Sequence, residues 1–519
     1  MRNIIQSLLL LVLLLINSLA AAASLEPQSL QFLLVNDFHG HIRQEANAPG
    51  ALKLITTAED LIKENPQGSI LIGGGDMLTG TLDSNEFRGR PAIEVMNAMG
   101  FVADACGNHA FDNNGNVIRQ QTRWAKFPFL AANVRDAEGN CAKPFSPSLL
   151  VTRKGIKIGI VGLTTMETPD KATKSNLAGF FFSDPVKEGN KAIADLKEQG
   201  AQVIVLVVHM ATFQDKEGKI TGDEVLPILD KLNKVDVVLS SHSHEVVSGF
   251  VTSQGRQIPV IQSGWAGNNV AGITGIYDQN LKELTQVHPF IKNVANTTAR
   301  PDPKLKKRLD EFLTSVDKKY RTPIATNVQA LSNNRWDPYS TCGDAMTDLM
   351  RKEANVQIAL YNGGALRSGL PAGSVSMVDI MNIFPYGGTL VTADLKGSDL
   401  RKAIEHGLDN KKYGFIHFSG LKVTGRVDQP EGNRIIELKL ADGTDIKDEQ
   451  TYKVVLGSFL LGGGDNYVML KNATNVVSRG LDVAFMRKAI EKQQKIDFLP
   501  DNRLQIIGPV TDSSIRHHN

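Results

Sequence analysis

Cysteine is scarce in this sequence: only Cys106, Cys141 and Cys342 occur among 519 residues. A small scaffold stapled by disulfides is therefore excluded, because such scaffolds are short and rich in cysteine. A chain of this length can bury enough surface for a core that does not depend on disulfides. We expect Cys106, which lies in an apolar segment, to be a small buried side chain. Cys141 could pair with either of the others, and one thiol stays unpaired within the chain in any case.

An excess of charge of one sign is also absent. Lys and Arg number 57 and Asp and Glu number 55, which gives a formal net charge of +2. No global basic field therefore favours a nucleic-acid polymer as a partner. Low-complexity tracts and long charge runs are lacking, and 42% hydrophobic and 22% charged residues are ordinary for a globular protein. The length allows two or three domains of about 100–200 residues each.

Long hydrophobic runs are missing except near the N-terminus. There Arg2 precedes an apolar run at residues 8–16, and the small residues 20–23 follow. This order is typical of a secretory signal peptide. A membrane anchor is the alternative, but the run is shorter than the roughly 20 apolar residues that span a bilayer. We predict a signal peptide at residues 1–23, export to the periplasm or medium, and no membrane span in the mature protein.

Short apolar runs alternate with helix-like stretches between residues 30 and 293. Runs of this length, rich in β-branched residues, are typical of buried strands, and their alternation with helices predicts a layered α/β domain. The predicted strands are Leu30–Val35, Ser69–Gly73, Ile156–Gly162, Val203–Val208, Val235–Ser240 and Ile258–Gln262.

A charged segment at residues 301–322 interrupts this pattern. Its apolar residues, Leu305, Leu309, Phe312 and Val316, share one face of a helix. Prolines stand on both sides, so we interpret the segment as a helix that connects two domains. A second α/β domain follows, with helices predicted at 343–354 and 398–408 and strands at 356–361 and 452–456.

Side chains that bind metals cluster directly after the predicted strands. In an α/β sheet the carboxyl ends of the strands meet in one crevice, where ligands bind. Imidazole together with carboxylate suits Zn²⁺, Mn²⁺ or iron. One such motif is usually a hydrogen-bonded loop, but five of them make a specific signal. The segments are Asn36-Asp37-Phe38-His39-Gly40, Gly75-Asp76, Gly107-Asn108-His109-Ala110-Phe111-Asp112, His209 and Ser241-His242-Ser243-His244.

The spacing of His242 and His244 bears on the number of metal ions. In a regular strand the two imidazoles would face one side, because side chains alternate. In a turn they can reach two different ions.

In this order the motifs Asp-x-His, Gly-Asp, Gly-Asn-His-x-x-Asp, His and His-x-His resemble the calcineurin-like metallophosphoesterases. Residues 28–507 as a whole resemble the secreted bacterial 5′-nucleotidase and UDP-sugar hydrolase family. The resemblance implies a four-layer α/β-sandwich metallophosphatase domain at 24–300 and a linker helix at 301–324. It further implies a second α/β domain that binds the nucleotide at 325–510, followed by a tail at 511–519.

The resemblance also implies a role for each motif residue. Two divalent ions such as Zn, Mn or Co would bind a phosphoryl oxygen and lower the pKa of a bridging water, whose hydroxide attacks phosphorus. His109 would stabilise charge on the phosphoryl group, and Asp112 would orient its ring. The implied ligands are Asp37, His39 and His244 for the first ion, Asn108, His209 and His242 for the second, and Asp76 as the bridge.

Four positions depart from the family pattern. Ala110 stands where Glu is usual, which predicts altered support of the site with activity retained. Ser241 replaces a usual Gly. The position of His244 is Gln or Asn in some relatives, which makes it the least certain ligand. Thr341 stands where many members carry an Arg, so a phosphate contact there would be weaker.

The second domain supplies candidate substrate-binding residues in three glycine-containing segments. From the residues alone, Tyr386 and Phe459 read as core aromatics and Arg367 as a surface residue. The resemblance reverses this: Tyr386 and Phe459 would sandwich the base, Asp465 would bind the ribose hydroxyls, and Asn362 and Arg367 would hold the nucleotide. Stacking accepts any base, since every base has a π face, so broad nucleotide specificity is expected.

The sequence thus predicts an exported enzyme that hydrolyses nucleoside 5′-monophosphates, AMP among them, to nucleoside and phosphate. One alternative is that the same active site hydrolyses a different bond: the pyrophosphate of UDP-sugars or NAD, or a 2′,3′-cyclic phosphodiester. A more remote alternative is a surface protein that binds nucleotides without catalysis. The intact set of ligands argues against it. The sequence leaves the oligomeric state open.

Overall fold

The computed structural model describes residues 28–172, 174–334, 336–408 and 413–507. The predicted signal peptide and tail lie outside these residues. The chain forms two compact units, which meet in the sequence between Val316 and Asp317. Among the described helices, none is long and apolar enough to cross a membrane.

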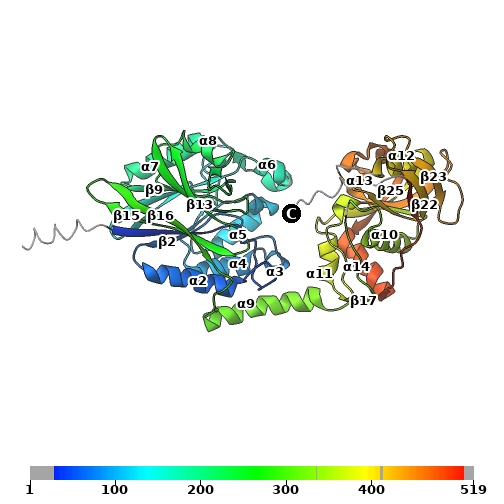
Figure 1. Ribbon diagram of the computed structural model, residues 1–519, viewed down its shortest axis with the longest axis horizontal. Helices are drawn as coiled ribbons and strands as arrows, with labels where there is room; N and C mark the ends of the chain where they lie inside the picture. The colour runs from blue at the N-terminus through cyan, green and yellow to red at the C-terminus, as the bar shows by residue number, and fades with distance from the viewer. Residues whose placement is uncertain (1–27, 173, 335, 409–412, 508–519) are drawn as a thin grey trace, which may run out of the picture. The chain divides into compact units, whose positions relative to one another are not determined.

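Two six-stranded sheets form the centre of the first unit (Figure 1). One has the strand order β16 (Glu283–Asn293), β15 (Asn269–Asp278), β1 (Gln28–Val35), β2 (Ser69–Gly73), β3 (Ala103–Ala105) and β4 (Phe129–Leu130). The other has the order β13 (Val246–Ser253), β14 (Arg256–Ser263), β12 (Val237–Leu239), β9 (Val203–His209), β7 (Ile156–Thr164) and β6 (Ser148–Arg153).

Alternating side chains build the layers of this unit. Phe32 and Leu34 point into a core shared with residues of the other sheet such as Val205. Their neighbours in β1, Leu33 and Val35, pack on the opposite face against the helices. The helices on that side are α2 (Ala51–Glu64), α4 (Arg90–Met99) and α5 (Gly115–Trp124), and α7 (Pro185–Glu198) and α8 (Val225–Leu229) cover the second sheet. The predicted four-layer α/β sandwich is confirmed.

The strands that precede the motifs run parallel to one another. β1 pairs in parallel with β2, and β2 with β3. In the second sheet β9 pairs in parallel with β12. Their carboxyl ends therefore lie at one edge of each sheet, which is the arrangement that places the loops after them together.

The predicted connecting helix is α9, Pro303–Val316, and one turn of π-helix, Asp317–Arg321, continues it. α9 packs on the first unit: Leu309 and Phe312 belong to its core, and the ring of Phe312 lies 4.7 Å from that of Phe87. Arg43 Nη2 donates to the carbonyl oxygen of Leu313 at 3.1 Å. The apolar face seen in the sequence is thus the face that α9 buries.

A five-stranded sheet forms the centre of the second unit, in the order β21 (Ile416–Ser419), β18 (Ile358–Asn362), β24 (Thr451–Gly457), β20 (Thr389–Lys396) and β25 (Thr474–Leu481). Three helices cover one face, α10 (Thr341–Ala354), α11 (Met377–Ile383) and α14 (Asp482–Gln493). The other face packs against α12 (Gly397–Gly407) and against the sheet of β22 (Leu421–Arg426), β23 (Ile435–Leu440) and β27 (Leu504–Ile507). A third sheet joins β17 (Ala325–Asn327), β19 (Gly373–Val375) and β26 (Lys495–Ile496).

The three cysteines are all free thiols. Cys106 and Cys342 are buried, as the apolar setting of Cys106 predicted, and Cys141 is partly buried. The possible pairing of Cys141 is therefore not realised.

A buried histidine in the second unit leads us to predict a loss of stability in acid. His417 lies on β21 against Gly343 of α10, and its Nε2 has no hydrogen-bond partner among the described residues. Burial and the nearby charge of Arg503 lower the pKa of His417 to about 4. The unfolded chain binds a proton near pH 6.5, so between these values the unfolded state holds more protons and stability falls as the pH falls.

We expect His417→Gln to remove this acid sensitivity. Between pH 7.5 and 4.5 the wild-type second unit should lose about 2–3 kcal/mol more unfolding free energy than the variant. Urea unfolding of both proteins at the two pH values measures the difference. Equal losses in the two proteins would show that His417 does not carry the effect.

Candidate functional site

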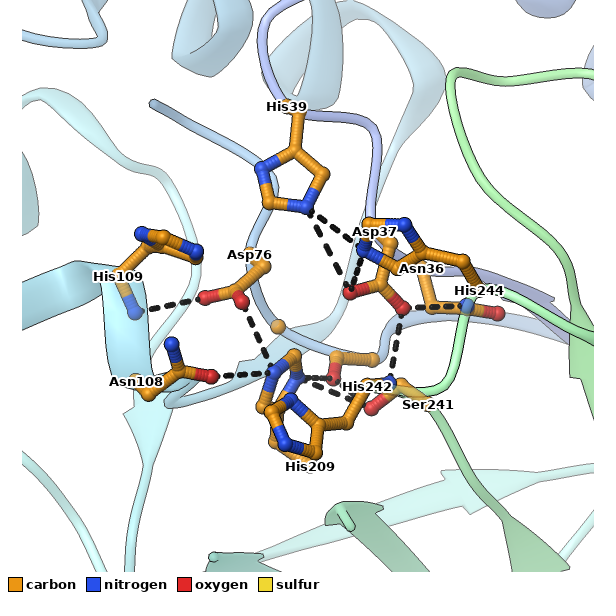
Figure 2. A network of polar contacts seen from close by, with 12 residues as sticks. Asn36, Asp37, His39, Asp76, Asn108, His109, His209, Ser241, His242 and His244 are labelled. Atoms are coloured by element: carbon orange, nitrogen blue, oxygen red, sulfur yellow. Dashed lines mark hydrogen bonds and ion pairs between the residues drawn. The ribbon is translucent and has the colours of Figure 1, made fainter. Parts of the chain in front are cut away.

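The loops after β1, β2, β3 and β12, together with the last residue of β9, bring the seven predicted metal ligands together in the first unit (Figure 2). Asp37, His39 and His244 form one group whose nearest ligand atoms all lie within 4.8 Å of one another. The Nε2 atoms of His39 and His244 lie 3.8 and 3.4 Å from Asp37 Oδ1 and 3.1 Å from each other. This geometry can hold one cation.

A second group consists of Asp76, His209 and His242, again with ligand atoms within 4.8 Å. His209 Nε2 lies 2.9 Å from Asp76 Oδ2 and 3.2 Å from Asn108 Oδ1, so Asn108 joins this group (Figure 2). His242 and His244 fall into different groups, as expected if they lie in a turn.

The backbone at these ligands is unusual. Asp37, His39, Asp76, His242 and His244 all have a positive φ, between 49° and 81°. Residues other than glycine rarely adopt this region, and each instance costs about 1–3 kcal/mol. Such strain persists only where the surroundings enforce it and clusters at functional sites.

The donor set fits divalent cations. Asp37 is fully buried, and its Oδ2 accepts hydrogen bonds from Asn36 Nδ2 at 2.7 Å and from the His242 backbone N–H at 3.0 Å. Its Oδ1 has no hydrogen-bond partner among the described residues and faces two imidazoles. A buried carboxylate oxygen without a donor is costly unless a cation balances it.

The imidazoles of His39 and His209 are also oriented to bind cations. Nδ1 of His39 lies 2.8 Å from the Thr79 carbonyl oxygen, and Nδ1 of His209 lies 2.9 Å from that of Gly74. In the neutral ring, donation from Nδ1 to a carbonyl leaves Nε2 with a lone pair that points into the site, as histidine ligands require.

Charges in the second group depend on one another. Burial opposes the charged forms of both Asp76 and His209, but their attraction outweighs it. It holds the pKa of Asp76 well below its usual range and raises the pKa of His209 to about 9. Burial, together with the charge of His209, lowers the pKa of His242. A cation bound at Nε2 of His209 has to displace a proton, so its uptake releases protons.

Three supporting side chains were not predicted as part of the site. Asn36 ties Asp37 to the Gly264 carbonyl through two bonds of 2.7 Å. Ser241, noted only as a departure, contacts His209 Nδ1 at 3.0 Å and donates to carbonyl oxygens (Figure 2). Trp265 stacks on His244 with ring centroids 5.8 Å apart and planes 9° apart. Nothing in the sequence motifs points to Trp265.

His109 and Asp112 lie in a 3-10 helix, Asn108–Asp112, beside the ligands. His109 Nδ1 lies 2.7 Å from Asp112 Oδ2, and this bond, ahead of the opposing effect of burial, raises the pKa of His109. The side chain of His109 is 43% exposed, so its ring can reach a substrate. Ala110, at the position of the usual Glu, packs against the hydrophobic core.

Asp104 is a further buried carboxyl group near the site. Its Oδ1 accepts the Gly75 N–H at 3.0 Å, which fixes the turn before Asp76. Burial raises the pKa of Asp104 to about 8. The sequence did contain a signal for Asp104, because it is a carboxylate within the otherwise apolar strand β3.

The five predicted substrate-binding residues of the second unit, Asn362, Arg367, Tyr386, Phe459 and Asp465, line one pocket of about 510 Å³. Tyr386 and Phe459 are 68% and 58% exposed, which rules out the alternative that they are core residues. Asn362 Nδ2 donates to Asp465 Oδ2 at 2.7 Å. The pocket therefore offers two open aromatic rings beside polar groups.

Other pocket residues were not singled out from the sequence. Tyr361 donates its hydroxyl to Asp482 Oδ2 at 3.1 Å, and both residues line the pocket. Thr341 is absent from the lining: its hydroxyl accepts the Ser332 N–H at 2.8 Å at the start of α10.

Comparisons with known proteins agree with this geometry. Residues 30–246 match the calcineurin-like phosphoesterase family, and residues 322–472 match the 5′-nucleotidase C-terminal domain. The snake venom 5′-nucleotidase of Naja atra is 27% identical, over 90% of this chain and 96% of that protein. The 5′-nucleotidase of Vibrio cholerae is 26% identical, over 90% and 91%.

A solved structure shares the fold. The crystal structure of a 5′-nucleotidase precursor from Thermus thermophilus has a TM-score of 0.63 at 24% identity and covers 93% of this chain and 100% of its own. Fold, motifs and relatives define a metallophosphoesterase that acts as a phosphoric monoester hydrolase. Within that class the chain belongs to the 5′-nucleotidase family, in which a C-terminal nucleotidase domain follows the calcineurin-like domain.

Proposed function

We propose that this protein is an exported 5′-nucleotidase that hydrolyses nucleoside 5′-monophosphates, including AMP, to nucleoside and phosphate with the help of two divalent cations. The observation that carries the proposal is the pair of Asp–His groups in the first unit, one around the unpartnered Oδ1 of Asp37 and one around Asp76. The signal-like N-terminus supports export, and its family supports nucleotides as substrates.

Each group would hold one cation. Asp37, His39 and His244 form the first set, and Asn108, His209 and His242 form the second. Asp76 would bridge the two sets, because its Oδ2 faces His209 while its backbone carbonyl accepts the His39 N–H at 3.0 Å, which fixes the distance between the two loops. When bound, two such cations supply Lewis acidity and lower the pKa of water.

The remaining residues of the site act on the phosphoryl group. The contact with Asp112 raises the pKa of His109 and so favours the protonated ring, which would present Nε2–H to oxygens that gain charge in the transition state. A preorganised donor of this kind stabilises the transition state more than the bound substrate. Asp112 keeps the proton on Nδ1 and so leaves Nε2 to face the substrate.

The pocket of the second unit would bind the nucleoside. Tyr386 and Phe459 would stack on the base, Asp465 would accept hydrogen bonds from the ribose hydroxyls, and Asn362 and Arg367 would hold the nucleotide. Stacking on exposed rings tolerates every base, so a broad range of monophosphates is the expected specificity.

Loss of either aromatic ring should weaken nucleotide binding without slowing phosphate hydrolysis itself. Tyr386→Ala and Phe459→Ala should each weaken nucleotide binding by about 1–3 kcal/mol, the usual contribution of one stacked base. Hydrolysis of para-nitrophenyl phosphate, which has no base, should hardly change. Steady-state kinetics on both substrates measure this. Parallel losses on the two substrates would contradict a role in base recognition.

A substrate panel tests the proposed function directly. Purified mature protein, with and without chelator, is offered nucleoside monophosphates, UDP-glucose, NAD and 2′,3′-cyclic AMP, and products are separated by chromatography. Nucleoside and phosphate from AMP, lost on chelation, are expected. Faster cleavage of a pyrophosphate or a cyclic diester would replace the proposal by that activity, and absence of any turnover would favour a binding protein.

A further inference from the structure

The last turn of α12 contacts the glycine-rich turn of the nucleotide pocket. His406 is 8% exposed, and its Nε2 lies 2.9 Å from the backbone carbonyl oxygen of Asp465. Its Nδ1 lies 2.8 Å from Oε1 of Glu431. The ring also packs edge-on against Tyr467, with centroids 4.7 Å apart. His406 therefore contacts the residue proposed to bind ribose at its backbone carbonyl and not at its carboxylate.

The turn that His406 contacts is strained. Asp465 and Asn466 follow one another with φ of 50° and 68°. Asp and Asn adopt this region more readily than other residues with a Cβ, but as single residues, so two in succession need neighbours to hold them. The conformation is held from two sides: Asn362 Nδ2 donates to the Asp465 carboxylate at 2.7 Å, and His406 contacts its carbonyl. Without the second contact, the carboxylate would lose part of its fixed direction.

The same turn supports an aromatic wall of the pocket. A Cβ added to Gly464 would lie 2.5 Å from the ring of Phe459, so the backbone of the turn packs directly on that ring. A shift of Asp465 therefore moves the surface against which Phe459 rests. One contact of His406 thus affects both the ribose-binding and the base-stacking groups.

Glu405, which precedes His406 in the sequence, holds the loop that carries Glu431. Glu405 is 7% exposed, and its Oε1 accepts the Gly432 N–H at 2.8 Å while its Oε2 accepts the Ile435 N–H at 2.9 Å. These bonds fix the loop between β22 and β23 that carries Glu431. The partner of His406 is therefore preorganised, and of His406, Glu405 and Glu431 only Glu431 is exposed.

We propose that His406, held by Glu431, is a positioning residue for nucleoside recognition: it fixes the Asp465 turn so that the ribose hydroxyls and the base meet a rigid pocket. This inference rests on the proposed function, because it assigns Asp465 to ribose. It predicts that the two residues affect discrimination among nucleotides and leave phosphate chemistry unchanged.

The test compares three substrates: AMP, its 2′,3′-dideoxy analogue and para-nitrophenyl phosphate. His406→Phe keeps the packing on Tyr467 and removes both hydrogen bonds. It should raise KM for AMP about 3- to 10-fold, the effect of one lost hydrogen bond. The preference for AMP over the dideoxy analogue should fall by a similar factor, and kcat on para-nitrophenyl phosphate should not change.

Two further variants and a control complete the design. His406→Gln retains a donor for the Asp465 carbonyl and should recover part of the preference. Glu431→Ala changes a half-exposed side chain, so it should fold normally and shift the preference in the same direction by a smaller factor. Lys402→Ala, at an exposed position of the same helix, is the matched control and should match wild type.

An unchanged preference in both His406→Phe and Glu431→Ala would overturn the inference, and so would equal losses on all three substrates. A wild-type protein that hydrolyses para-nitrophenyl phosphate but neither binds nor hydrolyses AMP would instead overturn the proposed function, and the inference with it.

Discussion

Asp76→Asn should lower kcat more than about 10³-fold, the largest effect of any single substitution that we expect. The change keeps the shape of the side chain but removes the negative charge from the carboxylate proposed to serve both cations, so it weakens both sites at once. It also removes the charge that pairs with His209 at 2.9 Å. Metal content by elemental analysis, together with kcat, measures the two losses.

Asp104→Asn is a suitable control for this change. Asp104 is equally buried, and burial raises its pKa to about 8, so its side chain is largely protonated at neutral pH. Asparagine retains an acceptor for the Gly75 N–H. We therefore expect near wild-type metal content and activity. Full activity of Asp76→Asn, or of wild type after chelation with metal absence verified, would contradict the proposed use of cations.

His109→Ala should lower kcat by roughly 10²–10³, the range for loss of one preorganised donor at a transition state. The side chain of His109 belongs to neither group of metal-binding atoms, so metal content should stay at the wild-type level. KM should change little, because the interaction strengthens only as charge develops. Kinetics and elemental analysis on the same preparation test both parts.

Asp112→Asn refines this test. The variant keeps the position of the hydrogen-bonding group beside His109 Nδ1 but removes its charge. A smaller fall in kcat than in His109→Ala is expected, because the ring remains in place with a weaker orienting partner. Loss of a metal ion in His109→Ala would mean that His109 is a ligand and has been assigned the wrong role.

Much of the fold could be predicted from apolar runs. Ser69–Gly73 is a strand over the full predicted range, because a short apolar run that is flanked by glycines and buried on both faces favours a strand over a helix. The antiparallel strands β13, β15 and β16 were not predicted. In β16 exposed and half-buried residues mix without a clear period, so neither strand nor helix periodicity stands out. Sheet pairing, a non-local property, stabilises such strands.

In the candidate site, too, local sequence features could be predicted and contacts between distant segments could not. The motif residues could be singled out because five segments with carboxylate, amide or imidazole side chains occur in the order of a known family pattern, mostly directly after predicted strands. The contacts of Trp265 and Ser241 could not, since both join segments distant in sequence: Trp265 follows β14, and Ser241 reaches Gly74, 167 residues away. In the second unit, His406 belongs to no sequence motif. Its contact with the Asp465 turn depends on the packing of α12 and so could not be predicted.

The unpartnered oxygen of Asp37 and the five strained ligand residues have a consequence for the lifetime of the exported enzyme proposed above. Metal bound to the folded state adds RT ln(1 + [M]/Kd) to its stability, about 2.7 kcal/mol at a hundredfold excess over Kd. While free metal exceeds Kd, each tenfold fall in its concentration raises the unfolded fraction, which proteases remove, by about tenfold for each of the two proposed cations. The amount of enzyme that survives in the surroundings should therefore follow their supply of divalent metal, at constant synthesis.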